Sequence, residues 1–114
     1  MNRSLTVAEM SLARWMLENG VPEAKAFLGQ LESLQVTPWR CVCGCASIDF
    51  QLDGHNPAPP GVHILGDFLF NDQDQLAGAF IYESGGLLSG IEVCGFEGDA
   101  PRVLPVAAML RPLD

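Results

Sequence analysis

The sequence predicts an α+β fold in which an N-terminal helical hairpin packs on a four-stranded, mostly antiparallel meander sheet. Three observations lead to this prediction. The apolar residues of the first third recur at helical spacing, whereas from Val36 onward they follow the shorter period of strands. Short runs rich in Gly, Asn and Asp separate the later segments and favour tight turns between antiparallel neighbours. With 114 residues, the chain is expected to form a single domain over 1–114.

The helical hairpin is expected over about residues 6–34. Thr6 and Glu9 have the spacing of a capping box, which predicts that a first helix covers 7–18. Pro22 suits the first turn of a second helix, whose apolar stripe then faces a core. Because the connection between them is short, the two helices should run antiparallel.

The sheet is expected over about residues 36–95, and residues 96–114 are expected to form an extended tail. The predicted strands are 36–52, 62–70, 76–83 and 87–94. If each turn lies at the centre of the segment that connects two strands, one row of paired residues across the sheet consists of Gly44, Phe70, Leu76 and Cys94. This row is expected on the face that the helices cover. The other face would be half apolar, and two helices cannot cover both faces. A second copy of the chain is therefore expected to cover it, which makes a homodimer.

The charge of the chain is strongly negative, at −8. Between Ala26 and Pro101 there are ten carboxylates and a single base, Arg40. Such a surface repels phosphate backbones and anionic lipid, which excludes nucleic acid and membranes as partners and favours a basic protein. The sequence has no apolar run typical of a signal peptide or membrane span, so a cytoplasmic location with reduced thiols is expected.

Four cysteines carry the most unusual chemistry: Cys41, Cys43 and Cys45 alternate along the chain, and Cys94 lies far downstream. Thiols in such a cluster bind a soft metal, cycle through oxidation or are simply buried. In a straight strand, same-face neighbours are about 6.5–7 Å apart, and in a meander Cys94 lies three strands away on the other face. Buried, reduced thiols are therefore the favoured interpretation. The alternative is a zinc site that uses these four cysteines, or cysteines of two subunits.

No catalytic or cofactor-binding residue is predicted. A reactive thiol needs a nearby positive charge, and Arg40 is the single cation within sequence reach of the cluster. The carboxylates Asp49 and Glu92 fall in strands at opposite edges of the predicted sheet, so they are interpreted as exposed edge charges. His55 and His63 flank a Pro-rich loop without an orienting partner.

Two blocks of the sequence resemble a family of small uncharacterised bacterial proteins. The blocks are Cys43-Gly44-Cys45-Ala46-Ser47-Ile48-Asp49-Phe50 and Gly86-Leu87-Leu88-Ser89-Gly90-Ile91-Glu92-Val93. In that family a Cys-Gly-Cys-x-Ser-hydrophobic-acidic segment precedes a Gly-x-Leu-Ser-x-hydrophobic-Glu-Val strand. The resemblance covers roughly Trp39 to Val93 and implies a bacterial origin but no established activity. The positions that it singles out are Cys43, Cys45, Ser47, Asp49, Ser89 and Glu92.

The favoured function is therefore that of a non-catalytic, acidic cytosolic protein that acts by self-association or by binding a basic protein partner. The alternative is a metal-thiolate protein that holds zinc with Cys41, Cys43, Cys45 and possibly Cys94. An enzyme that uses Asp49, Glu92 or a histidine is the third hypothesis.

Overall fold

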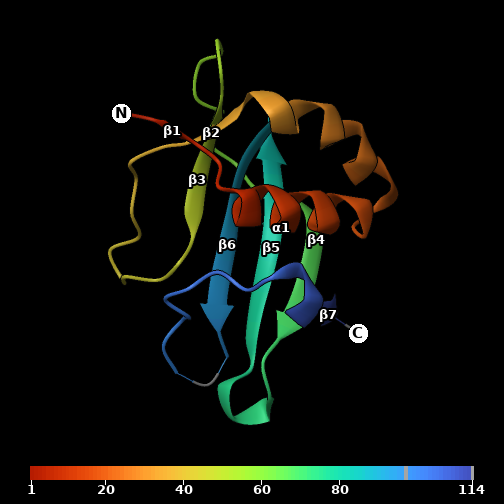
Figure 1. The fold of residues 1–114 in the computed structure, drawn as a ribbon, viewed down its shortest axis with the longest axis vertical. Coiled ribbons are helices and arrows are strands. Elements are labelled where there is room, and N and C mark those ends of the chain that lie inside the picture. The colour runs from red at the N-terminus through yellow and green to blue at the C-terminus, as the bar shows by residue number, and fades with distance from the viewer. Residues whose placement is uncertain (97, 114) are drawn as a thin grey trace.

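A computed structural model describes residues 1–96 and 98–113 (Figure 1). It has N-terminal helices and one antiparallel sheet of seven strands in the order β1-β2-β3-β6-β5-β4-β7. The strands are β1 (Arg3–Ser4), β2 (Leu34–Val36), β3 (Ile48–Leu52), β4 (His63–Phe70), β5 (Ala77–Ser84), β6 (Leu87–Gly95) and β7 (Arg111–Pro112). The helices are α1 (Val7–Glu18) and the 3₁₀ helices η1 (Pro22–Ser33), η2 (Gln73–Gln75) and η3 (Ala107–Met109). The α+β class is confirmed, but the prediction of four strands is wrong.

Helix α1 begins as the local sequence predicts. The Glu9 backbone N–H donates to Thr6 Oγ1 (3.1 Å), and the Thr6 N–H donates to the Glu9 carboxylate (2.8 Å), which completes the capping box. The Arg3 guanidinium also donates to both Glu9 carboxylate oxygens, at 2.8 and 2.9 Å. These hydrogen bonds tie β1 to the start of α1, and they lower the pKa of Glu9 below its usual value.

The second helix begins at Pro22 but winds as a 3₁₀ helix, η1. In Figure 1, α1 crosses in front of the long strands, and η1 lies at the top of the sheet. The Gln30 side chain holds η1 to the β5–β6 hairpin: its amide donates to the Gly86 carbonyl (2.8 Å) and accepts from the Leu88 N–H (3.0 Å). None of the described helices combines the length and apolar composition that a bilayer-spanning helix needs.

The predicted continuous strand 36–52 is wrong. It is split into β2 and β3, which pair with each other through Val36 and Phe50, and residues 37–47 between them form a loop. Two residues explain the interruption. Pro38 has no N–H for a ladder, and Gly44 adopts a φ of 81°, which reverses the chain locally. The clustered cysteines therefore lie in a loop and not in a strand; we call residues 37–47 the thiol loop.

The predicted meander holds for β4, β5 and β6 but fails for β3, which pairs with β6 through Ile48↔Ile91 and Asp49↔Gly90. The proline-rich segment between β3 and β4 is too long to impose a hairpin, so β3 joins the opposite edge of the meander. Strand β6 becomes an interior strand as a result.

The predicted alignment of Gly44, Phe70, Leu76 and Cys94 is also wrong. Phe70 pairs with Ala77 rather than with Leu76, because the β4–β5 turn contains the 3₁₀ helix η2 and is one residue longer than predicted. A shift of one residue moves every following side chain to the other face of a strand. Cys94 consequently shares its row with Gly78 and Leu69, on the face opposite the helices.

The two faces of the sheet differ in burial. The face under the helices holds fully buried side chains such as Ala79, Ile81 and Ile91, which pack with α1 residues in the core. Alternate residues lie on the other face, where all but the buried glycines Gly78 and Gly90 are partly or fully exposed, and we call this surface the open face. Its three rows are Ile64-Tyr82-Gly90-Asp49, Asp67-Phe80-Glu92 and Leu69-Gly78-Cys94.

The predicted extended tail covers residues 96–114, of which Glu97 and Asp114 lie outside the described residues. The segment contains the 3₁₀ helix η3 and the short strand β7, which pairs with β4 through Phe68↔Pro112. In Figure 1 this C-terminal segment, in blue, crosses in front of the sheet on the same side as α1. It thereby reaches the thiol loop, where the Ala46 N–H donates to the Pro101 carbonyl at 2.9 Å.

Candidate metal centre

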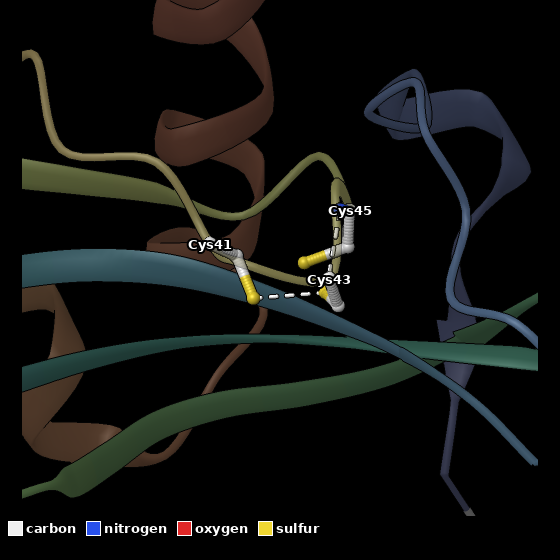
Figure 2. Close-up of side chains that lie close together, drawn as sticks. All are labelled: Cys41, Cys43 and Cys45. Atoms are coloured by element: carbon white, nitrogen blue, oxygen red, sulfur yellow. Dashed lines mark hydrogen bonds between the residues drawn. The ribbon is translucent and has the colours of Figure 1, made fainter.

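The thiol loop brings three sulfur atoms together. The Sγ atoms of Cys41, Cys43 and Cys45 all lie within 4.8 Å of one another, and those of Cys41 and Cys43 are 2.8 Å apart (Figure 2). The convergence comes from a tight turn in which the Gly44 N–H donates to the Cys41 carbonyl at 3.0 Å. The separation expected for a straight strand does not apply in such a turn, and the three side chains lie close enough to hold a metal ion.

The C-terminal segment fixes the apex of this turn. Arg102 Nη1 donates to the Gly44 carbonyl at 3.4 Å, and a Cβ atom at Gly44 would lie 2.5 Å from the same nitrogen. The far end of the loop is held by Thr37, whose hydroxyl donates to the Asp49 carboxylate at 2.8 Å. Contacts from distant parts of the chain thus shape a loop that has no regular secondary structure of its own.

Hydrogen bonds around the sulfurs favour the ionised form of Cys45. The Cys45 N–H donates to Cys43 Sγ at 3.3 Å, and Cys45 Sγ lies 3.3 Å from the Ser47 hydroxyl. Ser47 is buried, and its oxygen accepts the N–H of Val93 on β6 at 3.0 Å. Because the Ser47 oxygen already accepts that N–H, its own proton is available to a Cys45 thiolate.

The cysteines differ in acidity. Burial raises the pKa of Cys45, but hydrogen bonds from Ser47 and from the neighbouring thiols outweigh this effect and bring the pKa to about 7. The hydrogen bond between Cys43 and Cys41 instead raises the pKa of Cys43 to about 11. Near pH 7, Cys45 is therefore about half thiolate, whereas Cys43 remains a thiol.

A cavity of about 620 Å³ lies beside the sulfurs, between the N-terminal segment, the thiol loop and the C-terminal segment. Cys41 and Cys45 line it, as do Arg3, Arg40 and Arg102. Three of the chain's six Lys and Arg residues thus surround one cavity in a protein of net charge −8. Arg40 is the single cation within sequence reach of the thiols, but the fold also brings Arg102 and Arg3 to the cavity from the two ends of the chain.

Cys94, the fourth predicted ligand, lies on the open face beside Gly78. Burial raises the pKa of its thiol. In the described part of the chain, the group of residues able to share a metal ion consists of Cys41, Cys43 and Cys45. The structure therefore brings together three of the four predicted ligands.

The predicted acid–base candidates lie elsewhere. The prediction that Asp49 and Glu92 occupy opposite edges of the sheet is wrong, since β3 and β6 are neighbours and both carboxylates lie on the open face. His63 Nδ1 lies 2.6 Å from the Glu83 carboxylate on β5, and its Nε2 is 3.7 Å from that of Glu23. The imidazole of His63 is thus engaged by two carboxylates.

Sequence reasoning missed two contributors to the site, Arg102 and the pairing of Ser47 with Val93. The resemblance singles out Ser47, but the role of this residue depends on the pairing of β3 with β6. Comparisons with protein-family models, with curated proteins and with solved structures find no match to this chain. The function must therefore be inferred from the geometry of the site.

Proposed function

We propose that the protein binds a zinc ion through the thiolates of Cys41, Cys43 and Cys45. The observation that carries this proposal is the mutual approach of the three sulfurs to within 4.8 Å. Tetrahedral zinc with bonds of about 2.3 Å places its sulfur ligands about 3.8 Å apart. The three sulfurs lie close to that spacing, and Cys43 is exposed.

The surroundings of the sulfurs support the same proposal. Zinc binds the thiolate and displaces its proton, so a thiol that is already ionised binds with less cost. Cys45, with a pKa of about 7, meets this condition at neutral pH. Ser47 and the Cys45 N–H supply hydrogen bonds to sulfur, and outer partners of this kind orient metal ligands and tune their affinity.

Three protein ligands leave one position of a tetrahedral ion for a ligand from outside the chain. Zinc sites with three protein ligands and one exchangeable ligand are typical of centres that react or exchange, in contrast to closed structural sites. The cavity lined by Cys41 and Cys45 provides access to that position.

Elemental analysis of chain purified without chelator, together with thiol titration, tests the proposal. The expected result is about one zinc per chain, with Cys41, Cys43 and Cys45 protected in the folded, zinc-loaded chain and all four thiols reactive once unfolding releases the zinc. Cys94→Ser should keep the zinc, whereas Cys43→Ser should lose most of it. Zinc-free chain that stays zinc-free after reconstitution, or equal zinc binding by the triple serine variant, would overturn the proposal.

A second candidate function, the binding of a basic protein partner, is favoured by the open face. Its middle row holds Asp67, Phe80 and Glu92, and the Phe80 ring lies against the Tyr82 ring of the next row in a tilted arrangement, with centroids 5.7 Å apart. Asp49 adds a third carboxylate, and burial, followed by the charges of Asp49 and Glu92, raises the pKa of Tyr82.

This combination suits the side chains of a basic partner. Arginine pairs with carboxylates and stacks on aromatic rings, and the open face offers both side by side. A second copy of the chain on this face would oppose carboxylates to carboxylates, which is unfavourable. Charge complementarity therefore favours a basic partner on this face over the predicted homodimer.

Fluorescence anisotropy with a labelled peptide of alternating Arg and Tyr tests this second candidate. Glu92→Gln should weaken binding several-fold, whereas Glu32→Gln on η1, which changes the net charge equally, should not. Equal effects of the two variants would show that the peptide senses only net charge. A dimer in solution that Glu92→Gln strengthens would instead assign the face to a second copy.

A further inference from the structure

The cavity beside the thiol loop is basic, although the protein as a whole is acidic. Of its three arginines, Arg3 is neutralised by Glu9, the one carboxylate among the described residues that line the cavity. Within residues 1–96 and 98–113, neither Arg40 nor Arg102 forms an ion pair. The charges of Arg40 and Arg102 in the cavity are therefore not balanced by a carboxylate of the described lining.

The rest of the lining is largely apolar. It includes Leu12, Val36, Trp39, Ile48 and Leu104. The volume of about 620 Å³ lies within the range of about 300–1,000 Å³ that is typical of small-molecule sites. An apolar wall with a few placed cations suits a small organic anion.

The arginines and the sulfurs share the same space. Cys41, Gly44 and Cys45 line the cavity, and the Arg102 guanidinium contacts the backbone of Gly44, between Cys43 and Cys45. A molecule that binds Arg102 and Arg40 in this cavity therefore lies next to Cys41 and Cys45. One ligand can thus occupy both the anion site and the open metal position.

We propose that the cavity binds a small organic thiol that carries carboxylates, with its sulfur as the fourth ligand of the zinc ion and its carboxylates paired with Arg40 and Arg102. The sulfur part of this inference rests on the proposed zinc site; the carboxylate part rests on the arginines alone. Thiolate is the ligand type that matches three cysteines, and guanidinium groups bind carboxylates with charge-assisted hydrogen bonds.

The ligand exchange is balanced without an oxidant or reductant. The incoming thiol gives its proton to solvent, its sulfur bonds to zinc, and the water that held the fourth position leaves. Zinc with three thiolates has a net charge of −1 and by itself repels an anion. Arg40 and Arg102 offset that charge, which explains why cations surround the cavity.

Isothermal titration calorimetry of the zinc-loaded chain with three probes tests the inference. Mercaptosuccinate offers a thiol and carboxylates, 1-thioglycerol offers a thiol alone, and succinate offers carboxylates alone. Mercaptosuccinate should bind at least about tenfold more tightly than either of the other two. Equal affinity for mercaptosuccinate and 1-thioglycerol would overturn the inference.

Variants of the arginines sharpen the test. Arg40→Gln should weaken mercaptosuccinate binding about tenfold and leave 1-thioglycerol binding unchanged, whereas Arg102→Gln should weaken the binding of both probes. Because Arg102 also holds the thiol loop, Arg40→Gln is the variant that isolates the charge. Arg111→Gln is the matched control and should have no effect, because the Arg111 guanidinium donates to the Asn71 carbonyl, away from the cavity. No effect of either cavity variant would contradict the proposed role of the arginines.

The zinc content of each sample, measured first, separates this inference from the proposed function. A chain without zinc shows that the zinc proposal has failed. Succinate binding by that metal-free chain, if lost in Arg40→Gln, would still support the carboxylate site. Absence of such binding would overturn the inference.

Discussion

Arg102 Nη1 donates to the carbonyl oxygen of Gly44 at 3.4 Å, although 58 positions separate the two residues in the sequence. This contact places a cation from the C-terminal segment at the apex of a loop that carries three thiols. It links the loop conformation, the charge of the cavity and the position of the sulfurs. Each of these links can be broken separately by substitution.

Gly44→Ala should destabilise the protein and weaken zinc binding. An alanine at a φ of 81° costs about 1–2 kcal/mol, and its Cβ would also displace the Arg102 guanidinium. Gly54→Ala is the matched control, because Gly54 has a φ of 79° but nothing lies within 4 Å of a Cβ there. Urea unfolding should show similar losses for both variants, whereas zinc affinity should fall only for Gly44→Ala. Equal zinc affinity of the two would rule out a role for the Arg102 contact.

Ser47→Ala should raise the pKa of Cys45 toward its usual value and reduce zinc affinity. The hydroxyl is the principal group that lowers this pKa, and loss of an outer hydrogen bond to a metal ligand typically costs about tenfold to a hundredfold in affinity. Competition with a chromophoric chelator measures the affinity. Ser89→Ala, which removes the hydroxyl of another buried serine that donates to the Leu87 carbonyl, serves as the control. A Ser47 variant with unchanged affinity would contradict the geometry of the site.

In the metal-free chain, the rate at which iodoacetamide alkylates each cysteine should depend on pH in a different way. The thiolate is the reactive form, so the rate at Cys45 should reach half its maximum near pH 7, and that at Cys43 only near pH 11. Cys94, whose pKa is raised by burial, should react slowly at neutral pH. Peptide mass spectrometry resolves the sites. Equal rates at Cys45 and Cys94 at pH 7 would contradict the assigned acidities.

Acid should weaken the attachment of β1 to α1. The pKa of Glu9 is lowered by the hydrogen bonds from Arg3, so the stability that this pair adds is complete above the usual pKa of 4.5 and is lost as the pH falls through the lowered value in the folded state. Arg3→Gln should flatten this part of the pH profile of the urea midpoint. Arg14→Gln, at an exposed position of α1, should leave the profile unchanged. A profile identical in Arg3→Gln and the unaltered chain would show that the pair adds nothing.

The thiol loop shows where sequence reasoning stops. The alternation of Cys41, Cys43 and Cys45 is typical of a strand, and in a strand the sulfurs would stand too far apart for one ion. A strand accommodates a proline such as Pro38 near its first residue and a glycine such as Gly44 at a β-bulge. Together with the hydrogen bonds that the loop forms with the Pro101 carbonyl and the Arg102 guanidinium, they stabilise a loop instead. A prediction of local structure from neighbouring residues does not take into account hydrogen-bond partners that are more than fifty positions away in the sequence.

The amino-acid sequence by itself determined the features that depend on neighbours a few residues apart. The capping box of Thr6 and Glu9 and the start of η1 at Pro22 are of this kind, because their hydrogen bonds and backbone limits act within one helical turn. Only the tertiary structure decided the strand order, the register of β5 and the basic cavity beside the thiols. These depend on which distant segments bury apolar surface together, and a one-residue difference in a turn is enough to reverse a face.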